Sequence, residues 1–81
     1  MKMRQEEAYE NLANAIVLLA VEDYRKELKS IKQYPQKKEK AIDNAKKIEK
    51  FFRSGWYGVL TGVDGEYLIQ RLREEAGITE L

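Results

Sequence analysis

The chain has 81 residues, with 15 basic and 14 acidic side chains, so its near-neutral charge does not by itself indicate nucleic acid or a membrane surface as a partner. It holds no cysteine and no histidine, which removes disulfides, thiolate nucleophiles and the commonest general base and metal ligand. No apolar run approaches the roughly 20 residues of a membrane span. We therefore expect one cytoplasmic domain, residues 1–81, that is not an enzyme and uses no metal or cofactor.

A long first helix is predicted over residues 3–33. Apolar side chains recur there at helical spacing without glycine or proline, namely Tyr9, Leu12, Ile16, Leu19, Tyr24, Leu28 and Ile31. The centre of this helix, Ala15–Val21, is apolar on all sides, and such a helix is normally covered all round. A small domain has few elements to supply that cover, so we expect a homo-oligomer with this helix at a subunit interface. Burial within a single chain is the alternative.

A second helix is predicted over residues 36–53, because Tyr34 and Pro35 end the first. The short connection makes the two helices an antiparallel hairpin. The expected buried stripe of the second helix consists of Ala41, Ile42, Ala45, Ile48, Phe51 and Phe52. Lysines cover much of the remaining surface and alternate with three acidic residues, Glu39, Asp43 and Glu49. We interpret this face as an ordinary solvated surface, with nucleic-acid binding as the weaker alternative.

Two shorter helices are predicted over residues 55–61 and 65–76. Capping residues flank both of them, with Ser54 and Asp64 before the N-termini and Gly62 and Gly77 after the C-termini. The last helix is expected to bury an apolar side made of Tyr67, Leu68, Ile69 and Leu72, with Ile78 packing back beyond the stop.

The acidic pair Asp64 and Glu66 is interpreted as a helix cap and a first-turn acid, and not as a catalytic pair, because no nucleophile or base accompanies it. No segment has the pattern of a strand. The predicted fold class is therefore all-α: a long antiparallel helical hairpin with a short helix and a C-terminal helix, assembled as a helical homo-oligomer.

The segment Phe51–Tyr67 concentrates aromatic residues and glycines. It contains the only tryptophan, both phenylalanines and four of the five glycines. One interpretation is a packed corner, in which Phe51, Phe52 and Trp56 lock the last two helices onto the hairpin and the glycines permit caps and close contacts. Core packing is the more plausible role for the two phenylalanines.

The same segment also has the composition of a ligand site. Arg53 can bind a phosphate, Trp56 and Tyr57 can stack on a base, and free amides at two helix N-termini can add donors. Further positive charge is available from three candidate partners, Lys46, Lys50 and Arg71. A pocket of this kind would suit a nucleotide or a nucleotide-derived signal.

Two runs of the chain resemble a family of small, functionally unassigned proteins from phages and prophages of Gram-positive bacteria. The first is Phe-Phe-Arg-Ser-Gly-Trp-Tyr-Gly-Val-Leu-Thr-Gly-Val-Asp-Gly-Glu-Tyr-Leu-Ile at Phe51–Ile69, and the second is Ala-Ile-Val-Leu-Leu-Ala-Val-Glu-Asp-Tyr-Arg at Ala15–Arg25. The resemblance implies an accessory factor that acts against host defence. Some such inhibitors are helical oligomers that hold cyclic-nucleotide or ADP-ribose-type signals between subunits, and others bind a host protein.

From these observations we predict a phage-type accessory protein that sequesters a small nucleotide-derived signal in an inter-subunit pocket. The alternative is an interaction module that blocks a host enzyme, and the third possibility is a weak nucleic-acid binder. The expected partners are a second copy of the chain and either a small anionic nucleotide-like ligand or a host defence protein, in the cytoplasm of the bacterial host.

Overall fold

The structure, a computed structural model, describes residues 5–81, and every regular element in this range is helical. The elements in chain order are α1 (Gln5–Gln33), the 3-10 helix η1 (Pro35–Lys37), α2 (Lys38–Phe52), α3 (Gly55–Leu60) and α4 (Gly65–Ala76). The all-α class is therefore confirmed for the described residues. The start of the predicted first helix, residues 3 and 4, lies outside them.

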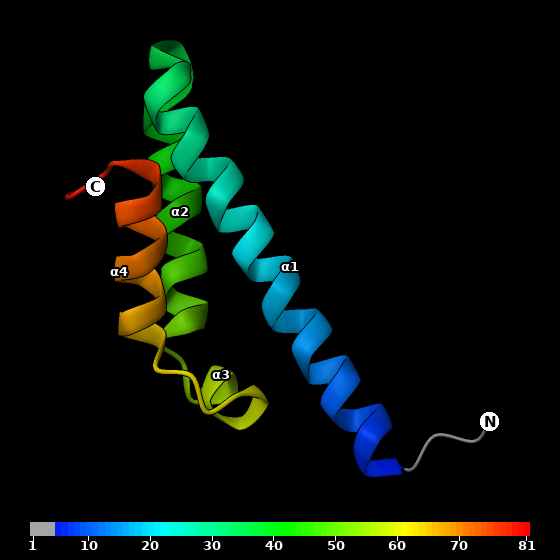
Figure 1. The fold of residues 1–81 in the computed structure, drawn as a ribbon. Coiled ribbons are helices and arrows are strands. Elements are labelled where there is room, and N and C mark those ends of the chain that lie inside the picture. The colour runs from blue at the N-terminus through cyan, green and yellow to red at the C-terminus, as the bar shows by residue number, and fades with distance from the viewer. Residues whose placement is uncertain (1–4) are drawn as a thin grey trace.

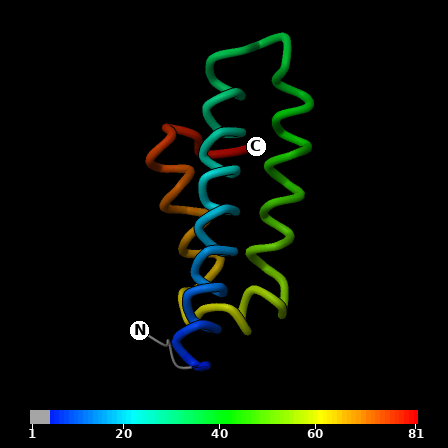
Figure 2. Tube along the Cα trace, turned by 90° about the vertical axis from the view of Figure 1, so that its right-hand side faces the viewer, coloured from blue at the N-terminus to red at the C-terminus, as the bar shows by residue number. Residues whose placement is uncertain are grey.

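The helices form an elongated body with dimensions of 48 × 23 × 19 Å. Helices α1 and α2 form the antiparallel hairpin, α4 packs against both, and α3 lies below α2 and α4, beside the N-terminal half of α1 (Figure 1). Figure 2 views the molecule from the side of α1 and shows α1 as the outer layer, with α2 and α4 behind it on either side. The outward face of α1 is thus uncovered along the helix.

The hairpin tip differs slightly from the predicted second helix. The tip begins as the 3-10 turn η1, with Pro35 at its first position, where the missing amide hydrogen costs nothing. The α-helix proper starts at Lys38, and Arg53 is its C-terminal cap instead of its last residue. The Tyr34 amide closes the end of α1 by donating to the Ser30 carbonyl at 3.0 Å.

The core lies between α1, α2 and α4 and is centred on aromatic rings. Phe52 packs edge-on against Tyr24, with ring centres 5.6 Å apart, and against Tyr57, with ring centres 5.7 Å apart. All three side chains are buried. Ala41 and Ala45 are also buried on the face of α2 that meets α1, and their small size lets the helices approach closely. The predicted burial of Phe52 is confirmed.

The predicted caps are largely confirmed. The Ser54 hydroxyl accepts from the Tyr57 amide at 3.1 Å, and Asp64 Oδ1 accepts from the Glu66 amide at 2.8 Å. Gly77 ends α4 at φ 73°, the one positive φ in the described part of the chain, and Ile78 is buried beyond it. The prediction for Gly62 was wrong, because α3 ends at Leu60 and the next residue is already extended.

The predicted apolar stripe of α1 is buried only in the C-terminal half. Tyr24 and Leu28 are fully buried, whereas Tyr9, Leu12 and Leu19 have exposed fractions of 51%, 61% and 61%. Leu12 and Leu19 are exposed because they lie on the side of α1 opposite the buried Tyr24 and Leu28. Tyr9 is exposed because α2, with 15 residues against 29 in α1, ends before it can cover the first turns of α1. Tyr67, expected on the buried side of α4, is also exposed.

Trp56 was one of the residues expected to lock the corner, and it does not do so, because 54% of it is exposed. The neighbouring Tyr57 takes the core position instead. Consecutive residues on a helix point about 100° apart, so only one of the two aromatic rings can face the core. The aromatic composition of the segment correctly predicted a packed corner, but the expectation that Trp56 lies on its buried side was wrong.

Candidate functional site

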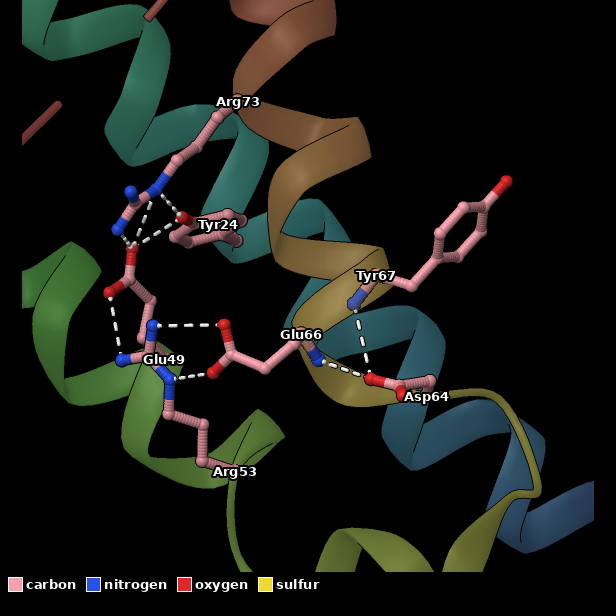
Figure 3. A network of polar contacts seen from close by, with 7 residues as sticks. All are labelled: Tyr24, Glu49, Arg53, Asp64, Glu66, Tyr67 and Arg73. Atoms are coloured by element: carbon pink, nitrogen blue, oxygen red, sulfur yellow. Dashed lines mark hydrogen bonds and ion pairs between the residues drawn. The ribbon is translucent and has the colours of Figure 1, made fainter. Parts of the chain in front are cut away.

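A polar cluster joins α1, α2 and α4 around the carboxylate of Glu49 (Figure 3). Glu49 is the one charged side chain that is buried among residues 5–81. Its Oε2 atom accepts from the Tyr24 hydroxyl at 2.5 Å and from Arg73 Nη2 at 2.6 Å. Its Oε1 atom accepts from Arg53 Nη1 at 3.3 Å. A carboxylate with these donors has its charge compensated within the fold.

Arg53 connects this cluster to the start of α4. Its guanidinium also pairs with Glu66, through Nε to Oε1 and through Nη2 to Oε2 at 3.4 Å. The cluster thus contains two arginines and two glutamates, with balanced charge. The hydrogen bond from Arg53 lowers the pKa of Glu66. Burial, followed by the hydrogen bond to Glu49, raises the pKa of Tyr24 to about 12.

Sequence reasoning missed the role of Glu49 by grouping it with the solvated lysine face. A signal was present, because Glu49 lies four residues after Ala45 and three before Phe52, which places it on the buried stripe of α2. An acid at a core position predicts a buried partner of opposite charge. The identity of that partner, Arg73, depends on where α4 docks and was not readable from α2.

The six predicted ligand residues do not gather in one place. Arg53 and Tyr57 line a cleft of about 690 Å³ between the end of α2, α3 and the start of α4, and the other four do not line it. Tyr57 is buried edge-on against Phe52, so its ring face is not free to stack on a base. The others are exposed elsewhere, with Trp56 on α3, Lys46 and Lys50 on α2, and Arg71 beside Glu74 on α4.

The electrostatics of this cleft do not favour an anion within a single chain. Arg53, its one basic lining residue, is already paired with Glu66, and Asp64 adds a further acid. The Asp64 carboxylate also occupies the first amides of α4. The Tyr57 hydroxyl is buried and has no hydrogen-bond partner among residues 5–81, and its burial raises its pKa.

A second feature is an exposed apolar surface, which we call the α3 surface and define as Trp56 and Val59 of α3 together with Val63 of the connection to α4. Their exposed fractions are 54%, 62% and 50%. On the opposite side of α3, Tyr57 and Leu60 are buried in the core. A groove beside Val59 separates α3 from the first turns of α1 and includes Tyr9 and Ala13 in its lining. The α3 surface is therefore presented on an anchored helix.

Within residues 5–81, no group of acidic side chains is arranged to hold a metal ion. None of the described helices has the length and apolar character that crossing a bilayer requires. Comparisons with protein-family models, with curated proteins and with solved structures found no significant match.

Proposed function

We propose that this chain is a non-enzymatic binding protein that docks on another protein through the α3 surface. The observation that carries this proposal is the exposure of Trp56 on a helix whose other face is fixed in the core. Tryptophan contributes more to protein interfaces than most residue types, and it does so best from a rigid support. Clustered exposed apolar side chains mark interaction sites on small proteins.

The same proposal includes the biological context that the resemblance implies. The protein acts as a phage-type accessory factor in the cytoplasm of a bacterial host, and its partner is a host defence enzyme that it blocks. The ionisable residues around Glu49 support a non-enzymatic role, since Arg53 and Arg73 are both paired with Glu49. Inhibition would then follow from occupancy of the partner's surface.

Sequestration of a nucleotide-derived signal is the second candidate, and the unpartnered Tyr57 hydroxyl favours it. Because the cleft has no uncompensated positive charge within one chain, a second copy would have to supply it. The exposed Lys46, Lys50 and Arg71 are the residues available for that purpose. Sequestration in this cleft therefore requires a homo-oligomer, whereas docking through the α3 surface does not.

A binding experiment separates the two candidates. The purified protein is immobilised and exposed to a lysate of infected, defence-active bacteria, and retained proteins and small molecules are identified by mass spectrometry. We expect one host protein in stoichiometric amount, lost with Trp56→Ala and kept with Tyr34→Ala, an exposed aromatic at the opposite end of the molecule. A retained nucleotide with no such host protein would instead favour sequestration.

A further inference from the structure

A small pocket lies between the last turns of α1 and the end of α4, and we call it the α1–α4 pocket. The two helices run in the same direction, so the end of α4 lies beside the last turns of α1 (Figure 1). Leu72 and Ala76 of α4 contribute apolar side chains to the lining, and the exposed Arg25, Lys29 and Lys32 of α1 contribute basic ones. The pocket has a volume of about 250 Å³, below the range of sites for drug-sized ligands, so it suits a smaller molecule.

The polar groups of this pocket are only partly paired. Arg25 donates two hydrogen bonds to Glu75, from Nε to Oε2 at 2.8 Å and from Nη2 to Oε1 at 3.2 Å. Lys32 Nζ donates to the Gly77 carbonyl at 3.3 Å, which offsets the partial negative charge at the end of α4. Lys29 belongs to no ion pair within residues 5–81. The Lys29 ammonium and the remaining protons of Lys32 are therefore available to a ligand.

The lining of the α1–α4 pocket has an excess of positive charge. Three basic side chains face one acidic side chain, Glu75, which leaves two positive charges uncompensated. The neighbouring groove adds the pair of Arg71 and Glu74, 3.6 Å apart, and so does not change this excess. In the cleft between α2, α3 and α4, by contrast, the one basic residue, Arg53, is paired with Glu66. A single chain therefore favours an anion at the α1–α4 pocket and not in that cleft.

We propose that the α1–α4 pocket binds a small phosphate monoester that carries an apolar group. A phosphate monoester has a charge of about −1.5 to −2 at pH 7, which matches the two uncompensated positive charges. Lys29 and Lys32 bind the phosphate oxygens, while Arg25 stays paired with Glu75. The apolar group of the ligand lies on the apolar side chains of α4. This site goes beyond the proposed function, because it shares no residue with the α3 surface.

A titration with phenyl phosphate, followed by two-dimensional NMR of the backbone amides, tests the site. Low ionic strength is required, because salt screens exposed charges. We expect one saturable set of shifts in the last turns of α1 and the end of α4. Inorganic phosphate and phenol, which each supply only half of the ligand, should bind more weakly. The absence of saturable shifts at millimolar phenyl phosphate, or inorganic phosphate binding equally well, would overturn the proposal.

Exposed residues of the pocket provide variants that should keep the fold, which circular dichroism checks. Lys29→Gln removes the unpaired ammonium, and Gln33→Glu adds an acid to the lining. Each should raise the dissociation constant for phenyl phosphate about tenfold. The matched control is Lys46→Gln, which removes an exposed lysine on α2 and should leave the constant unchanged. Full affinity in Lys29→Gln, or an equal loss in Lys46→Gln, would overturn the site. Lys29→Gln should still retain the Trp56-dependent host protein, so the two sites are tested separately.

Discussion

The core around Glu49 and the helix α3 differ in burial: the core contains a buried charge, and α3 carries exposed apolar side chains. Around Glu49, a charge is buried, and it is compensated by three donor side chains, Tyr24, Arg53 and Arg73. In α3, a tryptophan and a valine are left in solvent, although Tyr57 and Leu60 of the same helix are buried. The polar groups around Glu49 are paired within the chain. The apolar side chains of Trp56 and Val59, in contrast, stay exposed. This contrast is the reason for proposing α3 as the docking surface, and it predicts that the Glu49 cluster contributes mainly to stability.

The largest expected difference between the two regions comes from two aromatic truncations. Phe52→Ala should lower the free energy of unfolding by about 3 to 5 kcal/mol, because it opens a cavity between the buried rings of Tyr24 and Tyr57. Trp56→Ala should lower it by less than about 1 kcal/mol, as expected for an exposed side chain. Urea denaturation followed by circular dichroism measures both. Equal losses would mean that Trp56 belongs to the core and would remove the contrast.

Removal of the buried carboxylate should have the next largest effect. Glu49→Ala leaves Arg73 and the Tyr24 hydroxyl without their acceptor, which should cost about 3 kcal/mol, near the lower end for breaking a buried pair. We choose the lower end because the Arg73 side chain keeps a 22% exposed fraction. The matched control is Asp43→Ala, which breaks the exposed pair with Lys47 and should cost less than about 1 kcal/mol. Similar values for the two variants would place Glu49 in a solvated environment.

The smallest expected effect appears at alkaline pH. The pKa of Tyr24 is raised to about 12 in the folded chain, whereas an unfolded tyrosine titrates near 10. As the pH rises, the unfolded state loses this proton first, so the stabilisation is fully present below about pH 10 and is lost as the pH approaches about 12. Unfolding in urea between pH 9 and 12 should show a steeper loss for the wild type than for Tyr24→Phe.

The control for this titration is Tyr34→Phe, which removes an exposed hydroxyl and should keep the wild-type slope. Parallel curves for the wild type and Tyr24→Phe would show that the Tyr24 hydroxyl is not held against Glu49 in the folded protein.

Local patterns were sufficient to predict the helices and most of their ends. Helical spacing predicted α1, and side-chain chemistry predicted the caps at Ser54, Asp64 and Gly77. Which turns of α1 are covered is a question of relative length, because α1 rises about 44 Å and α2 about 22 Å. That comparison was available from the predicted boundaries, and it explains why Tyr9 is exposed. Leu12 and Leu19 are exposed for another reason, since they lie on the side of α1 opposite Tyr24 and Leu28.

The candidate site was harder to predict, because its residues come from different helices. Phe51–Tyr67 contained the correct residue types, yet a helix directs Trp56 outward and Tyr57 inward, and composition does not distinguish the two. The pairing of Arg53 with Glu66 depends on how α4 docks beside α2. The charged residues can be read from the sequence, but only the fold shows that the Arg53 guanidinium is already paired with Glu66.

The position of Arg73 opposite Glu49 also selects the handedness of the bundle. A helix that packs on a hairpin can lie on either of its two sides, and apolar contacts, which have no direction, distinguish these mirror arrangements weakly. With α4 on the other side of the hairpin, Arg73 would point away from α2, and Glu49 would stay buried without its strongest donor. This ion pair therefore favours the observed side of the hairpin over the other.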